Sequence, residues 1–259
     1  MSDRETSARK GARRSALRRL VAGTALAVTS AVTSTAAMVA VTLPMNAQGD
    51  ERAGKGTLAV ADPGSTGTGQ SPLSDDEIDR ARAIALVTDR PLRTMSEDVR
   101  GQDGDPQFLT AAVPESADAG ADERLVTLLF YDYGDDRTVK KTVDLTSGRV
   151  VETGSASGVQ PPPAGPEARE ALKVLLGSPV GDGVRQDFRA ATGVPLLDDR
   201  KLRVQGLTYD TPPRHAEELA DCAGAHRCVR LFTRVAGGPW IDTRQFVIDL
   251  SDRTAHRLP

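Results

Sequence analysis

The pattern of apolar and polar positions divides the chain into a leader, a polar stretch and two regions of periodic elements. Residues 20–43 are largely apolar and carry no charged side chain, whereas residues 48–72 contain almost no large apolar side chain. Beyond residue 72, apolar positions recur with the spacing of helices and strands. The pattern predicts one or two small domains with hydrophobic cores after a non-globular N-terminal part.

The first periodic region predicts a helix followed by strands. Ser74 and Glu77 have the spacing of a capping box, and the apolar positions after them trace one helix face as far as about Thr88. Pro91 prevents much continuation of this helix. Glycine- and aspartate-rich turns then separate strands expected at residues 107–113, 124–133, 138–145 and 149–151. We expect a β-meander packed on one helix.

The second periodic region repeats this order after a connector rich in proline and glycine at residues 154–166. Pro166 suits the first position of a helix at 167–176, and a second short helix is expected at 183–192. Strands are expected at residues 201–209, 228–235, 240–250 and 254–258. Gly237 and Gly238 predict a hairpin turn before Trp240.

The two regions resemble each other in sequence. Residues 142–150 and 247–254 both place Asp-Leu at a strand end, followed by a polar turn and a last strand. We therefore predict an α+β fold of two tandem small units at 73–153 and 167–259, each a helix on a three- or four-stranded antiparallel meander. The alternative is that β-turns commonly share such sequences.

The leader has the pattern of an export segment. Arg13 and Arg14 precede the apolar run, which suggests the twin-arginine route and places the rest of the chain outside the cytoplasm. Residues 1–47 would be a cleaved signal, or residues 20–43 would remain as a membrane anchor, so the protein would be secreted or membrane-anchored. Residues 48–72 would form a flexible linker.

The distribution of net charge along the chain limits the kinds of molecule that the protein is expected to bind. Residues 1–47 carry six basic and two acidic side chains, a net charge of +4, and the whole chain carries −3, so the remainder carries −7. A mildly acidic exported part argues against nucleic acid as a partner, because binding nucleic acid requires a basic face. An extracytoplasmic protein is the expected partner.

Cys222 and Cys228 are the two cysteines of the chain, and in an exported protein such a pair is expected to form a disulfide. The alternative is a metal site, in which Cys222, His226 and Cys228 supply ligands suited to copper or zinc, with His215 as a further candidate. If Cys222 and Cys228 form a disulfide, no cofactor is expected at these residues.

The remaining polar clusters give little indication of a catalytic or metal-binding site. Asp132, Asp135 and Asp136, like Asp198 and Asp199, fit turns better than an acid–base pair or a calcium loop. No nucleophile motif surrounds the serines of the connector.

Trp240, the single tryptophan, has two possible roles. It is either a core aromatic at a strand start or a surface anchor for a partner.

The capped helix, the meander, Gly158–Pro162 and a helix ending near Ser178-Pro179-Val180 together resemble the N-terminal region of copper amine oxidases. The stretch concerned is residues 73–207, here in a twin-arginine-exported protein of actinobacterial type. In that family two small cystatin-like domains precede the catalytic β-sandwich. The resemblance implies a cystatin-like, non-catalytic fold.

The family's catalytic motifs are missing from this chain. Its quinone cofactor forms from a tyrosine in an Asn-Tyr-Asp/Glu motif, and here the single asparagine is Asn46 in the leader; no His-x-His pair is present either. No functional residue of the family can be transferred. We expect an exported, non-catalytic protein-binding or regulatory module, or alternatively a copper- or zinc-handling protein linked to amine oxidase activity.

Overall fold

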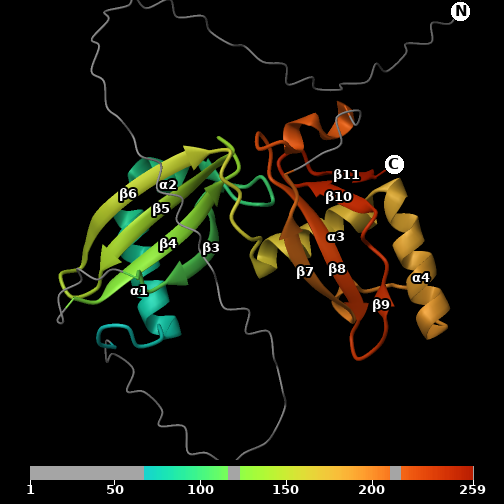
Figure 1. The fold of residues 1–259 in the computed structure, drawn as a ribbon, viewed down its shortest axis with the longest axis horizontal. Coiled ribbons are helices and arrows are strands. Elements are labelled where there is room, and N and C mark those ends of the chain that lie inside the picture. Colours follow the sequence, from blue (N-terminus) through green and yellow to red (C-terminus); the bar gives the residue numbers. More distant parts are fainter. Residues whose placement is uncertain (1–66, 116–122, 211–216, 259) are drawn as a thin grey trace, which may run out of the picture. The chain divides into compact units, whose positions relative to one another are not determined.

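The computed structural model of the chain describes residues 67–115, 123–210 and 217–258. These residues form an α+β fold of helices and antiparallel sheets, as expected (Figure 1). The predictions for the leader, including Arg13 and Arg14, and for linker residues 48–66 lie outside the described residues. Within the described ranges no helix is long and apolar enough to cross a membrane.

Helix α1 (Asp75–Val87) begins at the predicted capping box. The Glu77 amide donates to the Ser74 hydroxyl (3.2 Å), and the Ser74 amide donates to the Glu77 carboxylate (2.9 Å). The helix ends before Pro91, but the chain then forms a second short helix, α2 (Arg90–Met95), with Pro91 in its first turn. This helix was not expected; the Asp89 carboxylate caps it by accepting the Leu92 amide.

The first large sheet is an antiparallel meander whose strand order, β3-β4-β5-β6, follows the chain. Its strands are β3 (Gln107–Ala112), β4 (Leu125–Asp132), β5 (Arg137–Asp144) and β6 (Arg149–Ser157). Strand β6 is longer than predicted, because residues 154–157, assigned to the connector, pair with β5 as far as Arg137–Ser157. A small ladder of β1 (Ser96–Glu97) and β2 (Asp103–Gly104) precedes the sheet.

The second half begins with helices α3 (Gly165–Gly177) and α4 (Asp182–Thr192), joined by the 3₁₀ turn η1 (Pro179–Gly181). Pro166 lies in the first turn of α3, as predicted. The 3₁₀ turn η2 (Asp199–Lys201) leads into the second sheet, and η3 (Glu217–Cys222) follows its first strand. The sheet comprises β7 (Leu202–Thr208), β8 (Cys228–Val235), β10 (Phe246–Asp249) and β11 (Thr254–Arg257), with the short β9 (Trp240–Ile241) on β8.

The prediction of one strand over residues 240–250 is wrong, because residues 242–245 leave the ladder. The Asp242 carboxylate accepts the Arg244 amide (3.1 Å) and turns the chain. The Thr243 hydroxyl donates to the Leu231 carbonyl of β8 at 2.5 Å, so a side chain contacts β8 where a strand would have continued.

Two hydrophobic cores lie between helices and sheets. Helix α1 packs on β4, β5 and β6, and α3 packs on β7, β8, β10 and β11. The core beneath α3 also includes residues of the first half, namely Val99, Leu109, Tyr131 and Tyr133. The two halves therefore share a continuous apolar contact.

Each half contains a buried arginine–glutamate pair in the corresponding place. Arg124, just before β4, donates to both carboxylate oxygens of Glu77 in the first turn of α1 (2.8 and 3.1 Å). Arg227, just before β8, does the same to Glu167 in the first turn of α3 (2.9 and 3.1 Å). Each guanidinium also donates to backbone carbonyls of the segment preceding its helix. Bidentate hydrogen bonding of this kind fixes the relative orientation of the two side chains in addition to pairing their charges.

The two Asp-Leu turns match as well. The Leu145 amide donates to the Arg124 carbonyl (2.8 Å), and the Leu250 amide donates to the Arg227 carbonyl (2.9 Å). In both turns the preceding aspartate accepts an amide two residues on, at 2.8 Å for Asp144 and 2.9 Å for Asp249. The arginine of each pair is thereby bonded to the Asp-Leu turn that follows the neighbouring strand, β5 in the first half and β10 in the second.

Replacing Glu77 by Gln should lower the free energy of unfolding by about 3 kcal/mol at neutral pH, since Arg124 keeps a buried charge without a counter-ion. Hydrogen bonding from Arg124 lowers the pKa of Glu77 to about 2, from an ordinary 4.5. The stabilisation is therefore present above about pH 4.5 and is lost toward pH 2, so the two proteins should converge in acid.

Denaturant unfolding from pH 7 to pH 2 measures this difference. Lys140→Ala, which removes the exposed pair with Glu152, is the control and should cost less than about 1 kcal/mol. A Glu77→Gln effect as small as the control's, or one independent of pH, would contradict the role assigned to the pair.

Candidate functional site

Cys222 and Cys228 form the expected disulfide, between the end of η3 and the start of β8. Both residues are buried, and they pack with Tyr209, Leu219 and Val247 in a small cluster of their own. The bond therefore holds η3 against the sheet face that lies opposite α3.

In the structure the three residues of the metal hypothesis have other bonding partners. The two sulfurs are bonded to each other, so neither is a thiolate ligand. His226 instead bonds through Nδ1 to Asp249 Oδ2 at 2.8 Å, with Asp252 Oδ2 at 3.9 Å. His215 lies outside the described residues.

The His226 environment is acidic. Partial burial acts to lower the pKa of the imidazole, but the hydrogen bond and charge of Asp249, with the charges of Asp136 and Asp252, raise it above its ordinary value. Asp249 also accepts the amides of Ser251 and Asp252, at 2.9 and 3.1 Å. Although ligand atoms of His226, Asp249 and Asp252 lie within 4.8 Å of one another, Asp249 already accepts the two amides that shape the β10–β11 turn.

Asp136, near His226, connects the two halves of the described chain. It has φ 47°, and it accepts hydrogen bonds from the Tyr131 hydroxyl (3.1 Å) and the Ser251 hydroxyl. Burial raises the pKa of its carboxyl group despite these donors. The expectation that this aspartate cluster serves the turn agrees with its neighbour Asp132, which accepts the amides of Glu97 and Gly134.

Several exposed apolar side chains lie together on the second sheet, on the face opposite α3. Strand pairing places three large apolar and three basic side chains there, all on one side of β7, β8 and β9: Leu207, Phe232, Trp240, Arg203, Arg230 and Arg234. We call this set the arginine–aromatic face. Trp240 is 66% exposed, Leu207 50% and Phe232 46%.

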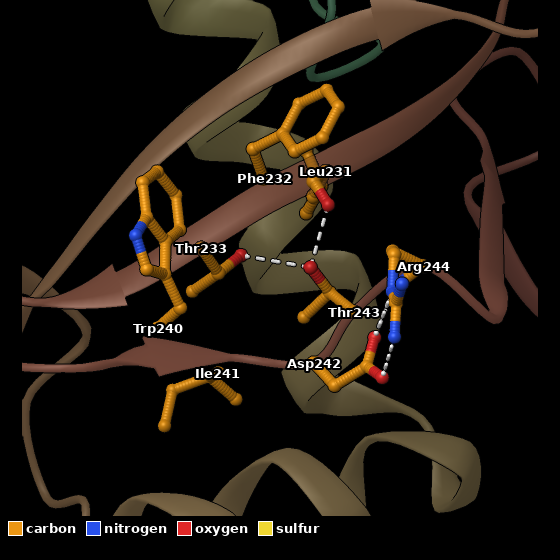
Figure 2. Close-up of a pocket in the computed structure, with 8 residues that line it drawn as sticks. All are labelled: Leu231, Phe232, Thr233, Trp240, Ile241, Asp242, Thr243 and Arg244. Atoms are coloured by element: carbon orange, nitrogen blue, oxygen red, sulfur yellow. Dashed lines mark hydrogen bonds and ion pairs between the residues drawn. The ribbon is translucent and has the colours of Figure 1, made fainter.

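Of the two roles weighed for Trp240, the structure excludes the buried one. Figure 2 shows the Trp240 and Phe232 rings on the same side of their strands, with Ile241 directed to the opposite side. Ile241 is only 4% exposed and belongs to the core. The Arg234 guanidinium lies 6.0 Å from the centre of the Trp240 ring, within reach of a cation–π contact.

A pocket of about 250 Å³ lies next to Trp240 and Phe232 of this face, beside the break between β9 and β10 (Figure 2). Trp240 and Phe232 line it together with the Thr233 and Thr243 side chains, whose hydroxyls are 3.4 Å apart. Its far rim is the ion pair of Asp242 and Arg244 (2.8 Å). The pocket is smaller than the range of roughly 300–1,000 Å³ typical of small-molecule sites, and suits a single side chain better than a cofactor.

The reason for the pocket is the break between β9 and β10. Because residues 242–245 turn away, neither β9 nor β10 pairs with β8 at Leu231, and on that side the Thr243 hydroxyl donates to the Leu231 carbonyl. Sequence reasoning expected an unbroken strand here and so missed the pocket, although Asp242 and Thr243, residues that favour turns, gave a local signal.

Comparison with known proteins provides little further information. No protein-family model matches the chain, and no curated protein matches it. Among solved structures, a copper-containing benzylamine oxidase from Hansenula polymorpha is a distant neighbour, with a TM-score of 0.40 and 13% sequence identity over 73% of this chain. This chain spans 29% of the length of that protein. At this similarity the comparison establishes neither family nor function.

Replacing both Cys222 and Cys228 by Ser should lower the free energy of unfolding by about 2 kcal/mol, since the bond closes a short loop. Thiol alkylation with intact-mass measurement should find both cysteines blocked until reduction, and zinc should not change the unfolding midpoint of either protein. Free thiols in the native protein, or stabilisation by zinc that the double Ser variant loses, would instead support the metal site.

Proposed function

We propose that the chain is an exported, non-catalytic module that binds another protein outside the cytoplasm through the arginine–aromatic face. The observation that carries this proposal is the exposure of Trp240 beside Phe232 and Leu207 on one sheet face. Contiguous exposed apolar side chains mark interaction surfaces, and tryptophan and arginine are enriched among the residues that dominate binding energy.

Export is supported by the sequence of the leader. Paired arginines before a moderately apolar run favour the twin-arginine route, which carries folded proteins. The disulfide between Cys222 and Cys228 is consistent with an oxidising compartment.

The two halves are, in this proposal, copies of one α+β unit. The matched contacts of Arg124 and Arg227 with the first turns of α1 and α3 support this, as does the chain-order meander in each sheet. The arginine–aromatic face lies on the second copy.

Export is tested by replacing Arg13 and Arg14 with Lys, which keeps the charge but removes the guanidinium pair. The amount of protein outside the cytoplasm should fall about tenfold. Arg18→Lys with Arg19→Lys is the matched control and should export normally. Equal loss in both double variants would point to a requirement for general basicity, against the twin-arginine route.

Binding is tested with a photo-crosslinking amino acid in place of Trp240, introduced in the cell that exports the protein. A discrete crosslinked species should form at this position and disappear when Phe232 is also replaced by Ala. The control places the crosslinker at Val151, an exposed apolar position on β6 of the first sheet, 57% exposed. Identical products from both positions, or none from position 240, would argue against the proposed surface.

A further inference from the structure

We infer that the occupant of the arginine–aromatic face is an acidic protein segment that inserts one large apolar side chain into the pocket beside Trp240. This inference rests on the proposed function and adds the chemistry of the partner.

The charge of the face is opposite to that of the exported chain as a whole. Arg203, Arg230 and Arg234 lie on adjacent strands, with Arg203 directly opposite Arg234. None of the three lies within ion-pair distance of a carboxylate among the described residues, whereas Arg244 is paired with Asp242. Residues 48–259 carry a net charge of −7, so this group of arginines is a local positive patch that selects acidic partners.

The apolar members determine which acidic partner fits. Trp240 and Phe232 line a pocket of about 250 Å³, which is large enough for one side chain. A purely anionic polymer would neutralise the arginines and leave these rings in water. A polypeptide with carboxylates on either side of an aromatic or long aliphatic residue covers both kinds of group, and this favours protein over polysaccharide.

Part of the same sheet face is covered by a segment of the chain itself. At its other end η3, held by the disulfide, packs Leu219 and Cys222 over Cys228 and Val247. Cys228 and Phe232 are on the same side of β8, four residues apart. The described part of the chain covers Cys228 and leaves Phe232 open, so a partner segment on Phe232 and Trp240 would continue an existing layer.

The test uses a short fluorescein-labelled peptide with Glu and Asp on both sides of a central Phe, added to the exported protein. Anisotropy should report saturable binding that weakens with salt, and the emission of Trp240, the single tryptophan, should shift to the blue. A peptide with Lys at the acidic positions, and an acidic peptide with central Gly, should each bind at least about tenfold more weakly.

Charge reversal at Arg203→Glu with Arg234→Glu should weaken the acidic peptide at least about tenfold. The matched control, Arg149→Glu with Arg189→Glu, makes the same charge change at exposed positions on the first sheet and on α4 and should bind normally. Trp240→Ala should abolish binding of the central-Phe peptide. Unfolding midpoints confirm that each variant is folded.

Equal binding by both double variants, or absence of peptide binding to the unaltered protein, overturns the inference. Binding of hyaluronate that survives Trp240→Ala also overturns it, in favour of a polyanionic polysaccharide. If the crosslink from position 240 persists in the Arg203→Glu, Arg234→Glu variant, the face binds a partner but not through acidic groups. In that case the proposed function stands and the inference falls.

Discussion

The buried ion pair of Glu167 and Arg227 is the interaction on which the rest of the structure depends. Both side chains are fully buried, and the guanidinium also donates to the Pro161 carbonyl (2.7 Å) and to Gln160 Oε1 (3.1 Å). The Tyr133 hydroxyl donates to Glu167 at 2.8 Å. The start of α3, the connector, the start of β8 and the end of β4 therefore meet at one charged pair. Removing either partner would leave an unpaired charge in the interior. The pair therefore constrains how these segments can be arranged.

The corresponding pair of Glu77 and Arg124 explains how a small meander holds its helix. A helix packed on a sheet by apolar contacts alone could slide, since those contacts have little direction. Here the first turn of each helix is bonded at two oxygens to the residue preceding a central strand. The carbonyl of the same arginine accepts the leucine amide of the Asp-Leu turn after the neighbouring strand. One residue in each half thus links the first turn of the helix to the turn between the last two strands.

Much of this fold could be predicted from the sequence, because its signals are local. The Ser74–Glu77 capping box, Pro166 and the Gly237-Gly238 turn lie where the chain indicated. The extent of β6 could not be predicted, since residues 152–157 are polar or small and their strand conformation comes from pairing with β5. The break at residues 242–245 depends on side-chain bonds that no apolar periodicity reports. The ion pairs join residues 47 and 60 positions apart, and only an alignment of the two halves could have suggested them.

The candidate site illustrates the same limit. The disulfide followed from composition and the expected compartment, but the arginine–aromatic face depends on which side of β8 each residue occupies and on what covers it. Cys228, Arg230, Phe232 and Arg234 alternate along one side of the strand, while Leu231 and Val235 pack in the core on the other. The inner side is closed by α3, and the Glu167–Arg227 pair lies just ahead of β8. A partner on the outer side would therefore bind a surface whose framework is already fixed, without reordering the core, and this is the property a rigid binding module requires.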